Sequence, residues 1–152
     1  PVVLANVTNL YFDLSYYKDP EEPGYYWGGF TDTRKAWEFV PTNMYLTFTQ
    51  DLMGKAIPQS AFKDKQRLSE AGKANIIGIQ GHLWGETVKN PELIDYMYFP
   101  RALALAERAW AQDPAWAQVK DSVQRIAAIQ TAWNEFANRL GQIELLRLDG
   151  IK

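Results

Sequence analysis

The stretch of sequence that decides the fold is Ile76-Ile77-Gly78-Ile79-Gln80-Gly81-His82-Leu83-Trp84-Gly85-Glu86. Its first four residues are apolar and predict a short strand buried in a sheet. The strand gives way to a glycine-rich turn that carries an indole ring at Trp84 and a carboxylate at Glu86. In α/β barrels, residues at the carboxyl ends of strands form the functional site, whereas the strands themselves provide packing. We therefore expect a binding edge at this turn.

Length and composition limit what surrounds this turn. The 152 residues are 47% hydrophobic and 22% charged, which is typical of a single globular domain. Sixteen basic and 18 acidic residues give a net charge of −2 without a basic stripe, so nucleic acid is not an expected partner. No apolar run approaches the roughly 20 residues of a membrane span. The absence of cysteine excludes disulfides and thiolate catalysis.

A second apolar run, Val2-Val3-Leu4-Ala5, predicts another strand buried on both faces. Asn6–Asn9 is expected to be a turn, and the breaker-rich segment from Tyr16 to Gly29 a long loop. The polar segment Thr31-Asp32-Thr33 is a candidate cap for a helix over 34–39. Further helical segments are expected over 42–52, 61–71, 90–98, 100–110 and 116–140, the last one ended by Gly141. A final strand is possible at 145–148.

This order of elements predicts an α/β fold made of two consecutive βα units and a C-terminal helical extension. Two parallel strands cannot close a core, so we expect the C-terminal fragment of a larger (β/α)8 TIM barrel. The chain opens at Pro1 inside an apolar run, which also suggests a piece of a longer protein. We place the barrel part in residues 1–112 and a long helix with its tail, packed on that part, in residues 113–152.

Polar and aromatic side chains follow each predicted strand. Tyr11, Asp13 and Trp27 follow the first, and Trp84 and Glu86 follow the second. Because successive parallel strands end on the same rim, these groups should form one pocket with ring walls and carboxylate acceptors. A hexopyranose suits such a pocket, since its C–H faces stack on indole and its hydroxyls donate to carboxylates.

Four motifs, in order along the chain, carry a resemblance to a known family. They are Tyr11-Phe12-Asp13, Asp19–Gly28, Gly81–Glu86 and Phe99–Trp110. Together they resemble the C-terminal part of the family 20 glycoside hydrolases, the β-N-acetylhexosaminidases, and look closest to bacterial chitobiase-type enzymes. The resemblance covers residues 1–110 and continues more loosely into the last helix.

The resemblance implies hydrolysis of terminal N-acetylglucosamine or N-acetylgalactosamine with retention, in which the substrate's own acetamido oxygen is the nucleophile. Carried over by position, Tyr11 looks like the hydroxyl that holds the acetamido oxygen for attack. Asp13 and Glu86 look like acceptors for sugar hydroxyls around O4 and O6. Trp84 looks like the platform under the ring, and Trp27 like a wall of the acetamido pocket. No cofactor or metal is expected.

One departure from the family pattern limits what this chain can do. The family's catalytic pair is an adjacent Asp-Glu, in which Glu is the general acid, and no Asp-Glu occurs in this sequence. Glu21-Glu22 belongs to the loop motif, so the pair is expected upstream of Pro1. We therefore expect the chain alone to be inactive and to need the N-terminal barrel portion of the same protein as its partner.

Simpler interpretations stand beside the functional ones. Trp84 could be a core side chain, Glu86 a helix cap, and Asp13 an acceptor for turn amides. His82, the only histidine, has no neighbouring ligands that would suggest a metal, so a satisfied structural histidine is expected. The helix expected over 100–110 predicts core positions at Leu103, Ala106 and Trp110. It also predicts ion pairs for Arg101, Glu107 and Arg108.

Two other functions stay open. The rings and carboxylates would also suit a carbohydrate-binding or interaction module with no reaction of its own. Exposed strand edges could also lead the fragment to self-associate. Family resemblance suggests a periplasmic, envelope-associated or secreted protein, whereas the sequence itself leaves the compartment unknown.

Overall fold

The computed structural model describes residues 1–51 and 53–150. Its tertiary contacts divide the chain into two compact units, Pro1–Asp113 and Pro114–Lys152. The first unit contains an α/β arrangement with a small parallel sheet, and the second unit is helical. Within the described residues, no helix is both long enough and apolar enough to cross a membrane.

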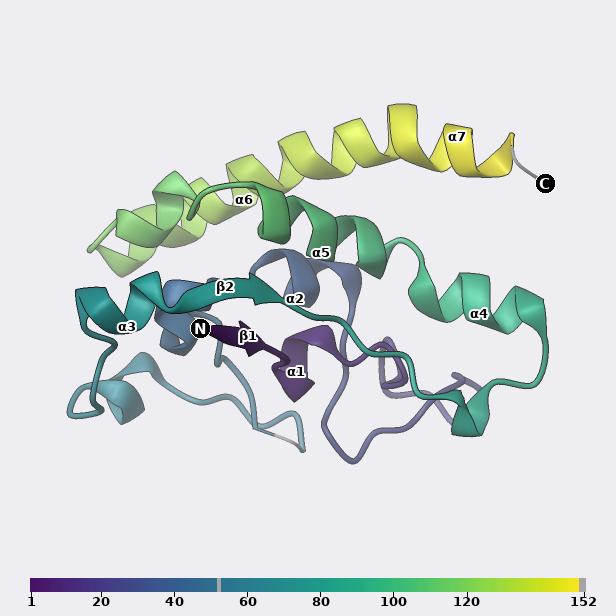
Figure 1. Ribbon diagram of the computed structural model, residues 1–152, viewed down its shortest axis with the longest axis horizontal. Helices are drawn as coiled ribbons and strands as arrows, with labels where there is room; N and C mark the ends of the chain where they lie inside the picture. The colour runs from purple at the N-terminus through teal and green to yellow at the C-terminus, as the bar shows by residue number, and fades with distance from the viewer. Residues whose placement is uncertain (52, 151–152) are drawn as a thin grey trace. The chain divides into compact units, whose positions relative to one another are not determined.

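The sheet of the first unit consists of β1 (Val2–Leu4) and β2 (Ile76–Ile79), which pair in parallel (Figure 1). Both strands lie where the apolar runs predict them. The expected burial is wrong for this chain, because Val3 is 48% and Ile77 is 68% exposed. A parallel sheet is buried when both of its faces are covered, and the two-stranded sheet of the described residues is not covered on both faces.

After β1 the chain forms one helical turn, α1 (Val7–Leu10), where the sequence predicted a simple turn. Pairing with the other strand then resumes. The amide of His82 donates to Leu10 O at 2.9 Å, and the amide of Phe12 donates to His82 O at 2.6 Å. The segments that follow the two strands therefore stay side by side beyond the end of the regular sheet.

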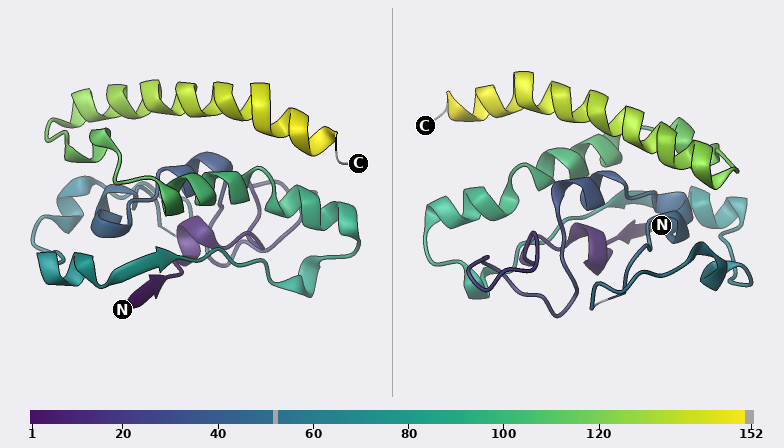
Figure 2. Two further views of the ribbon diagram at one scale, coloured as in Figure 1. Left: turned by 45° about the horizontal axis from the view of Figure 1, so that its top comes forward. Right: turned by 180° about the vertical axis from the view of Figure 1, so that it is seen from behind.

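Two packed helices, α2 (Thr33–Trp37) and α5 (Arg101–Trp110), lie on the same side of the strand pair (Figures 1 and 2). Asp32 caps α2 as predicted, accepting a hydrogen bond from the Lys35 amide at 2.7 Å. Helix α4 (Pro91–Tyr98) precedes α5 and is capped by Asn90, whose side chain accepts from the Leu93 amide at 2.8 Å. The predicted helices at these positions are confirmed.

The buried face of α5 differs from the predicted one. Arg101, Ala104 and Arg108 are its buried residues, whereas Trp110 is 92% exposed. The buried positions recur at three- and four-residue steps, so they form one face of the helix. The core of this unit also includes apolar side chains from the segment after β1, from α2 and its end, and from α4. They are Leu10, Phe12, Leu14, Ala36, Trp37, Phe39, Val40 and Met97.

The connection from α2 to β2 contains three short helices. They are η1 (Pro41–Leu46), η2 (Gln59–Phe62) and α3 (Glu70–Ala74). The helical segment predicted over 42–52 is a 3-10 helix that ends at Leu46, and the end of that predicted range, Leu52, lies outside the described residues. The segment predicted over 61–71 becomes helical only at Glu70, where Ser69 provides the cap.

The second unit contains a long helix whose two ends differ from the prediction. After a short 3-10 helix, η4 (Ala115–Gln118), helix α6 (Ser122–Arg139) begins at Asp121, which accepts from the Gln124 amide at 2.8 Å. Gly141 does not end it, because the backbone there is not in the left-handed conformation of a glycine cap. The chain continues through a π-helical stretch, η5 (Leu140–Glu144), into α7 (Leu145–Asp149). The possible strand at 145–148 is therefore wrong.

Candidate functional site

The two segments that follow the strands bring three rings into a row. Tyr11 and His82 pair as an isolated parallel bridge, and their ring centroids lie 4.9 Å apart. The His82 ring is nearly parallel to the Trp84 indole, with 4° between their planes and 5.8 Å between their centroids. The two strand ends therefore meet at Tyr11 and His82, and the Trp84 indole stacks on the same histidine ring.

The loop from Tyr16 to Gly29 folds back on the segment that precedes it. The amide of Tyr25 donates to Asp13 O at 2.8 Å, and the amide of Ser15 donates to Tyr25 O at 2.7 Å. This return places the Trp27 indole edge-on to the Tyr11 ring, 6.2 Å between centroids. The close approach depends on Gly24, which has φ of +106°, and a β-carbon there would lie 2.7 Å from Asp13 O.

Asp13 is the buried carboxylate of the site, with 2% of its surface exposed. Its Oδ1 is buried and has no hydrogen-bond partner. Burial raises the pKa of Asp13 and the charge of Glu86 raises it further, while the main-chain amides of Asp13 and Trp84 and the Arg101 guanidinium oppose the rise. The carboxylate therefore has one oxygen without a protein donor among the described residues and lies within electrostatic range of Glu86.

Trp27 and Trp84 have about half of their surface exposed to solvent in this chain. Trp27 is 55% and Trp84 is 49% exposed, so neither indole is a core side chain among the described residues. Glu86 lies in a short 3-10 turn, η3 (Gly85–Thr87), which has no side-chain cap. Glu86 is thus in the first turn of this short helix without making a capping hydrogen bond, and both indoles have exposed surface that a ligand could cover.

His82 is the residue of this site that sequence reasoning missed. It was expected to be a satisfied structural histidine, yet its Nε2 is buried without a hydrogen-bond partner. The ring also lies between those of Tyr11 and Trp84. Its place in the strand-end turn, two residues before Trp84, was the feature of the sequence that could have indicated this.

The ion pair predicted for Arg101 is also wrong. Its guanidinium donates to main-chain carbonyl oxygens, including those of Phe12 and Leu14. Arg108 Nη2 lies 3.7 Å from the carboxylate of Glu107, its neighbour in the same helix. Arg101 is therefore connected to the segment that carries Asp13, although it is far from that segment in sequence.

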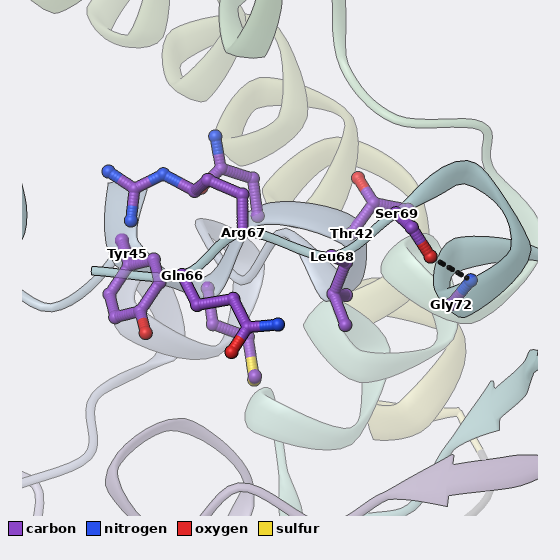
Figure 3. A pocket seen from close by; sticks show the side chains of 9 residues that line it. Thr42, Tyr45, Gln66, Arg67, Leu68, Ser69 and Gly72 are labelled. Atoms are coloured by element: carbon purple, nitrogen blue, oxygen red, sulfur yellow. Dashed lines mark hydrogen bonds between the residues drawn. The ribbon is translucent and has the colours of Figure 1, made fainter. Parts of the chain in front are cut away.

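A separate hollow of about 440 Å³ lies in the connection that precedes β2 (Figure 3). Its lining includes Tyr45, Arg67 and Ser69, and none of the predicted site residues. The Arg67 guanidinium lies 4.3 Å from the centroid of the Tyr45 ring and donates to Phe62 O at 2.9 Å. The ring and the cation are thus engaged with each other, and the candidate site is the one that follows the strands.

Rings and a buried carboxylate at the carboxyl ends of parallel strands lie where α/β-barrel enzymes place their active sites. Residues 1–113 match the family described as glycosyl hydrolase family 20, catalytic domain. The chain therefore belongs to glycosyl hydrolase family 20.

Curated relatives agree with this assignment. The N,N'-diacetylchitobiase of Vibrio harveyi is 36% identical over 165 residues, covering 97% of this chain and 17% of the relative. A β-hexosaminidase of Vibrio vulnificus is 31% identical, covering 97% of this chain and 19% of the relative. These relatives are glycoside hydrolases by name, and the chain spans less than a fifth of their length.

A solved structure supports the fold. The exo-β-N-acetylglucosaminidase of Vibrio harveyi, determined in complex with N-acetylglucosamine, is similar with a TM-score of 0.56 and 27% sequence identity. The similarity covers 98% of this chain and 18% of that one. The α/β arrangement of the chain is thus similar to a segment of a family 20 enzyme.

Proposed function

We propose that this chain is the C-terminal part of the catalytic barrel of a β-N-acetylhexosaminidase, and that it supplies sugar-binding residues to the active site. One observation carries the proposal: Trp27, Tyr11, His82 and Trp84 form a continuous row of rings beside the buried Asp13. Family membership makes an N-acetylhexosamine at the end of an oligosaccharide the expected ligand of that row.

The barrel assignment would explain why side chains of the sheet are exposed in this chain. The chain would provide the last two βα units of a (β/α)8 barrel, followed by a helical extension. Helices α2 and α5 cover one side of the strand pair, while Val3 and Ile77 have exposed side chains. Further strands of the same barrel would cover such side chains, because the inside of a barrel is filled by side chains from all of its strands. The partner is then the N-terminal barrel portion of the same protein.

Each site residue has a chemical task in this proposal. The Tyr11 hydroxyl holds the substrate's acetamido oxygen against the anomeric carbon, which makes an intramolecular attack effective. The carboxylates of Asp13 and Glu86 accept hydrogen bonds from sugar hydroxyls, and such charge-assisted bonds are stronger than neutral ones. Trp84 stacks under the sugar ring, and Trp27 forms a wall of the acetamido pocket.

The proton for the leaving oxygen must come from elsewhere. No adjacent Asp-Glu pair occurs among the 152 residues. Loss of a general acid lowers a rate by about 10²- to 10⁴-fold. The chain by itself would therefore bind a sugar without hydrolysing its glycosidic bond.

The test compares the whole protein with the 152-residue chain in hydrolysis of nitrophenyl N-acetyl-β-glucosaminide. We expect turnover by the whole protein and none by the chain. Nitrophenyl β-glucoside is the control substrate, because it lacks the acetamido group and should not be hydrolysed. Turnover by the chain alone would overturn its assigned role. Sugar binding by the whole protein without turnover would favour a carbohydrate-binding module instead.

A further inference from the structure

Arg101, the first residue of α5, has a side chain with no exposed surface. Its Nη1 donates to Leu14 O at 2.7 Å and to Thr31 O at 3.0 Å. Its Nη2 donates to Phe12 O at 2.6 Å and also to Met97 O, to which Nε donates at 2.9 Å. One guanidinium thus binds the strand-end segment, the loop before α2 and the end of α4.

Aromatic rings complete the enclosure of this guanidinium. Its Cζ lies 3.9 Å from the centroid of the Tyr16 ring and 5.3 Å from that of Phe12. The Tyr16 hydroxyl in turn donates to Phe99 O at 2.8 Å and to Tyr96 O at 3.1 Å. A buried charge is costly unless hydrogen bonds compensate for its lost hydration. Here the main-chain carbonyls, the Tyr16 and Phe12 rings and the charge of Glu22 all contribute to that compensation.

The carbonyls that Arg101 binds lie on both sides of Asp13. Phe12 O belongs to the peptide group before Asp13 and Leu14 O to the Leu14–Ser15 peptide group, so Arg101 holds the chain on both sides of Asp13. The carbonyl oxygen of Asp13 itself accepts a hydrogen bond from the Tyr25 amide in the returning loop. The backbone that carries the Asp13 carboxylate is therefore held from two directions, and Arg101 supplies one of them.

We propose that Arg101 is a positioning residue, which holds the Phe12–Leu14 segment so that the Asp13 carboxylate faces the bound sugar. This inference depends on the proposed function for its substrate. Its positive charge has a second effect, because it opposes the rise in the pKa of Asp13 that burial causes. Arg101 thus acts on sugar binding through Asp13, without touching the sugar.

Two substitutions in the whole protein separate geometry from charge. Arg101→Lys keeps the charge but loses the planar fork that reaches several carbonyls at once. We expect it to raise the KM for nitrophenyl N-acetyl-β-glucosaminide by about tenfold. Arg101→Met removes the charge as well, so the acid limb of kcat/KM should also move to higher pH. Hydrogen exchange of the Phe12–Ser15 amides should become faster in both variants.

Arg108→Lys is the matched control, since Arg108 is the other buried arginine of α5 and lies 5.5 Å from the Trp37 ring centroid. It should lower thermal stability without changing the KM or the acid limb. Tyr16→Phe provides a milder variant if Arg101→Met fails to fold, because it removes the bonds to Tyr96 O and Phe99 O and keeps the stacked ring. It should raise the KM less than Arg101→Lys does.

The outcomes distinguish the two proposals. If the Arg101 variants are less stable but keep the wild-type KM, acid limb and hydrogen exchange at Phe12–Ser15, the positioning role is overturned. If the wild-type protein neither hydrolyses the substrate nor binds N-acetylglucosamine, the proposed function fails. Hydrogen exchange then still decides whether Arg101 holds the segment, because that measurement requires no activity.

Discussion

The two halves of one parallel pairing, β1–β2 and the segments that follow them, differ sharply in burial. Val3 and Ile77 in the regular strands are largely exposed, whereas Phe12 and Leu14 in the following segment have no exposed surface. The regular strands are apolar in sequence but are covered on one side only within this chain. The segment after them, which carries Asp13, is enclosed by α5 and by the returning loop. The contacts with α5 and with the returning loop therefore hold the candidate site in place, although the sheet itself has exposed side chains.

The largest expected effect tests this difference in burial directly. Leu14→Ala should lower the free energy of unfolding of the 152-residue chain by about 2–5 kcal/mol, because it removes a fully buried side chain and leaves a cavity. Ile77→Ala, a change of the same size at a 68% exposed position, should cost less than about 1 kcal/mol. Urea denaturation measures both values. Equal losses would contradict the comparison.

A smaller effect concerns the loop that closes over the segment. Gly24→Ala should cost about 1–3 kcal/mol, since it combines a positive φ with a β-carbon 2.7 Å from Asp13 O. Gly54→Ala is the control, because Gly54 also has a positive φ, +79°, but an added β-carbon meets nothing within 4 Å. The same denaturation assay should show a clearly smaller loss for Gly54→Ala. A larger loss there would mean that the loop return is not tight.

The buried carboxylate predicts a pH dependence. Because burial raises the pKa of Asp13 above its ordinary value of 3.8, the folded state binds this proton more tightly than the unfolded state. Ionisation of Asp13 therefore lowers the free energy of unfolding as the pH rises from 3.8 through the pKa of the folded state. Asp13→Asn should remove this cost, so its stability relative to wild type should grow across that window. Denaturation at a series of pH values would refute this if the difference stayed constant.

The smallest effect distinguishes the chain from the whole protein. Val3→Thr should change the stability of the 152-residue chain by no more than about 0.5 kcal/mol, because Val3 is half exposed there. In the whole protein, the proposed barrel would bury the new hydroxyl, and its loss of hydration should cost about 1–3 kcal/mol. Equal effects in both would argue against further strands covering this side chain.

Local patterns in the sequence predicted much of this structure. The strands at Val2–Leu4 and Ile76–Ile79 follow from apolar runs, and the helices after Asp32 and Asn90 follow from their caps. Caps and short runs involve neighbouring residues, so they can be read without knowing the fold.

Several features that depend on distant contacts were not predicted. Arg101 was expected to form an ion pair, yet its bonds to Phe12 O and Leu14 O span 89 and 87 residues. The position of His82 between two rings required the pairing of both strand ends. Gly141 was expected to end the helix because glycine can adopt the left-handed conformation of a cap. The residue does not adopt that conformation here.

The most direct test of the sugar-binding role is the kcat/KM of the whole protein and of its Tyr11→Phe variant on nitrophenyl N-acetyl-β-glucosaminide. The Tyr11 ring lies between Trp27 and His82, and removal of its hydroxyl leaves those ring contacts intact. We expect kcat/KM to fall by about 10²-fold, because the acetamido oxygen would lose the group that orients it. An unchanged kcat/KM in a folded Tyr11→Phe protein would contradict the role assigned to this site.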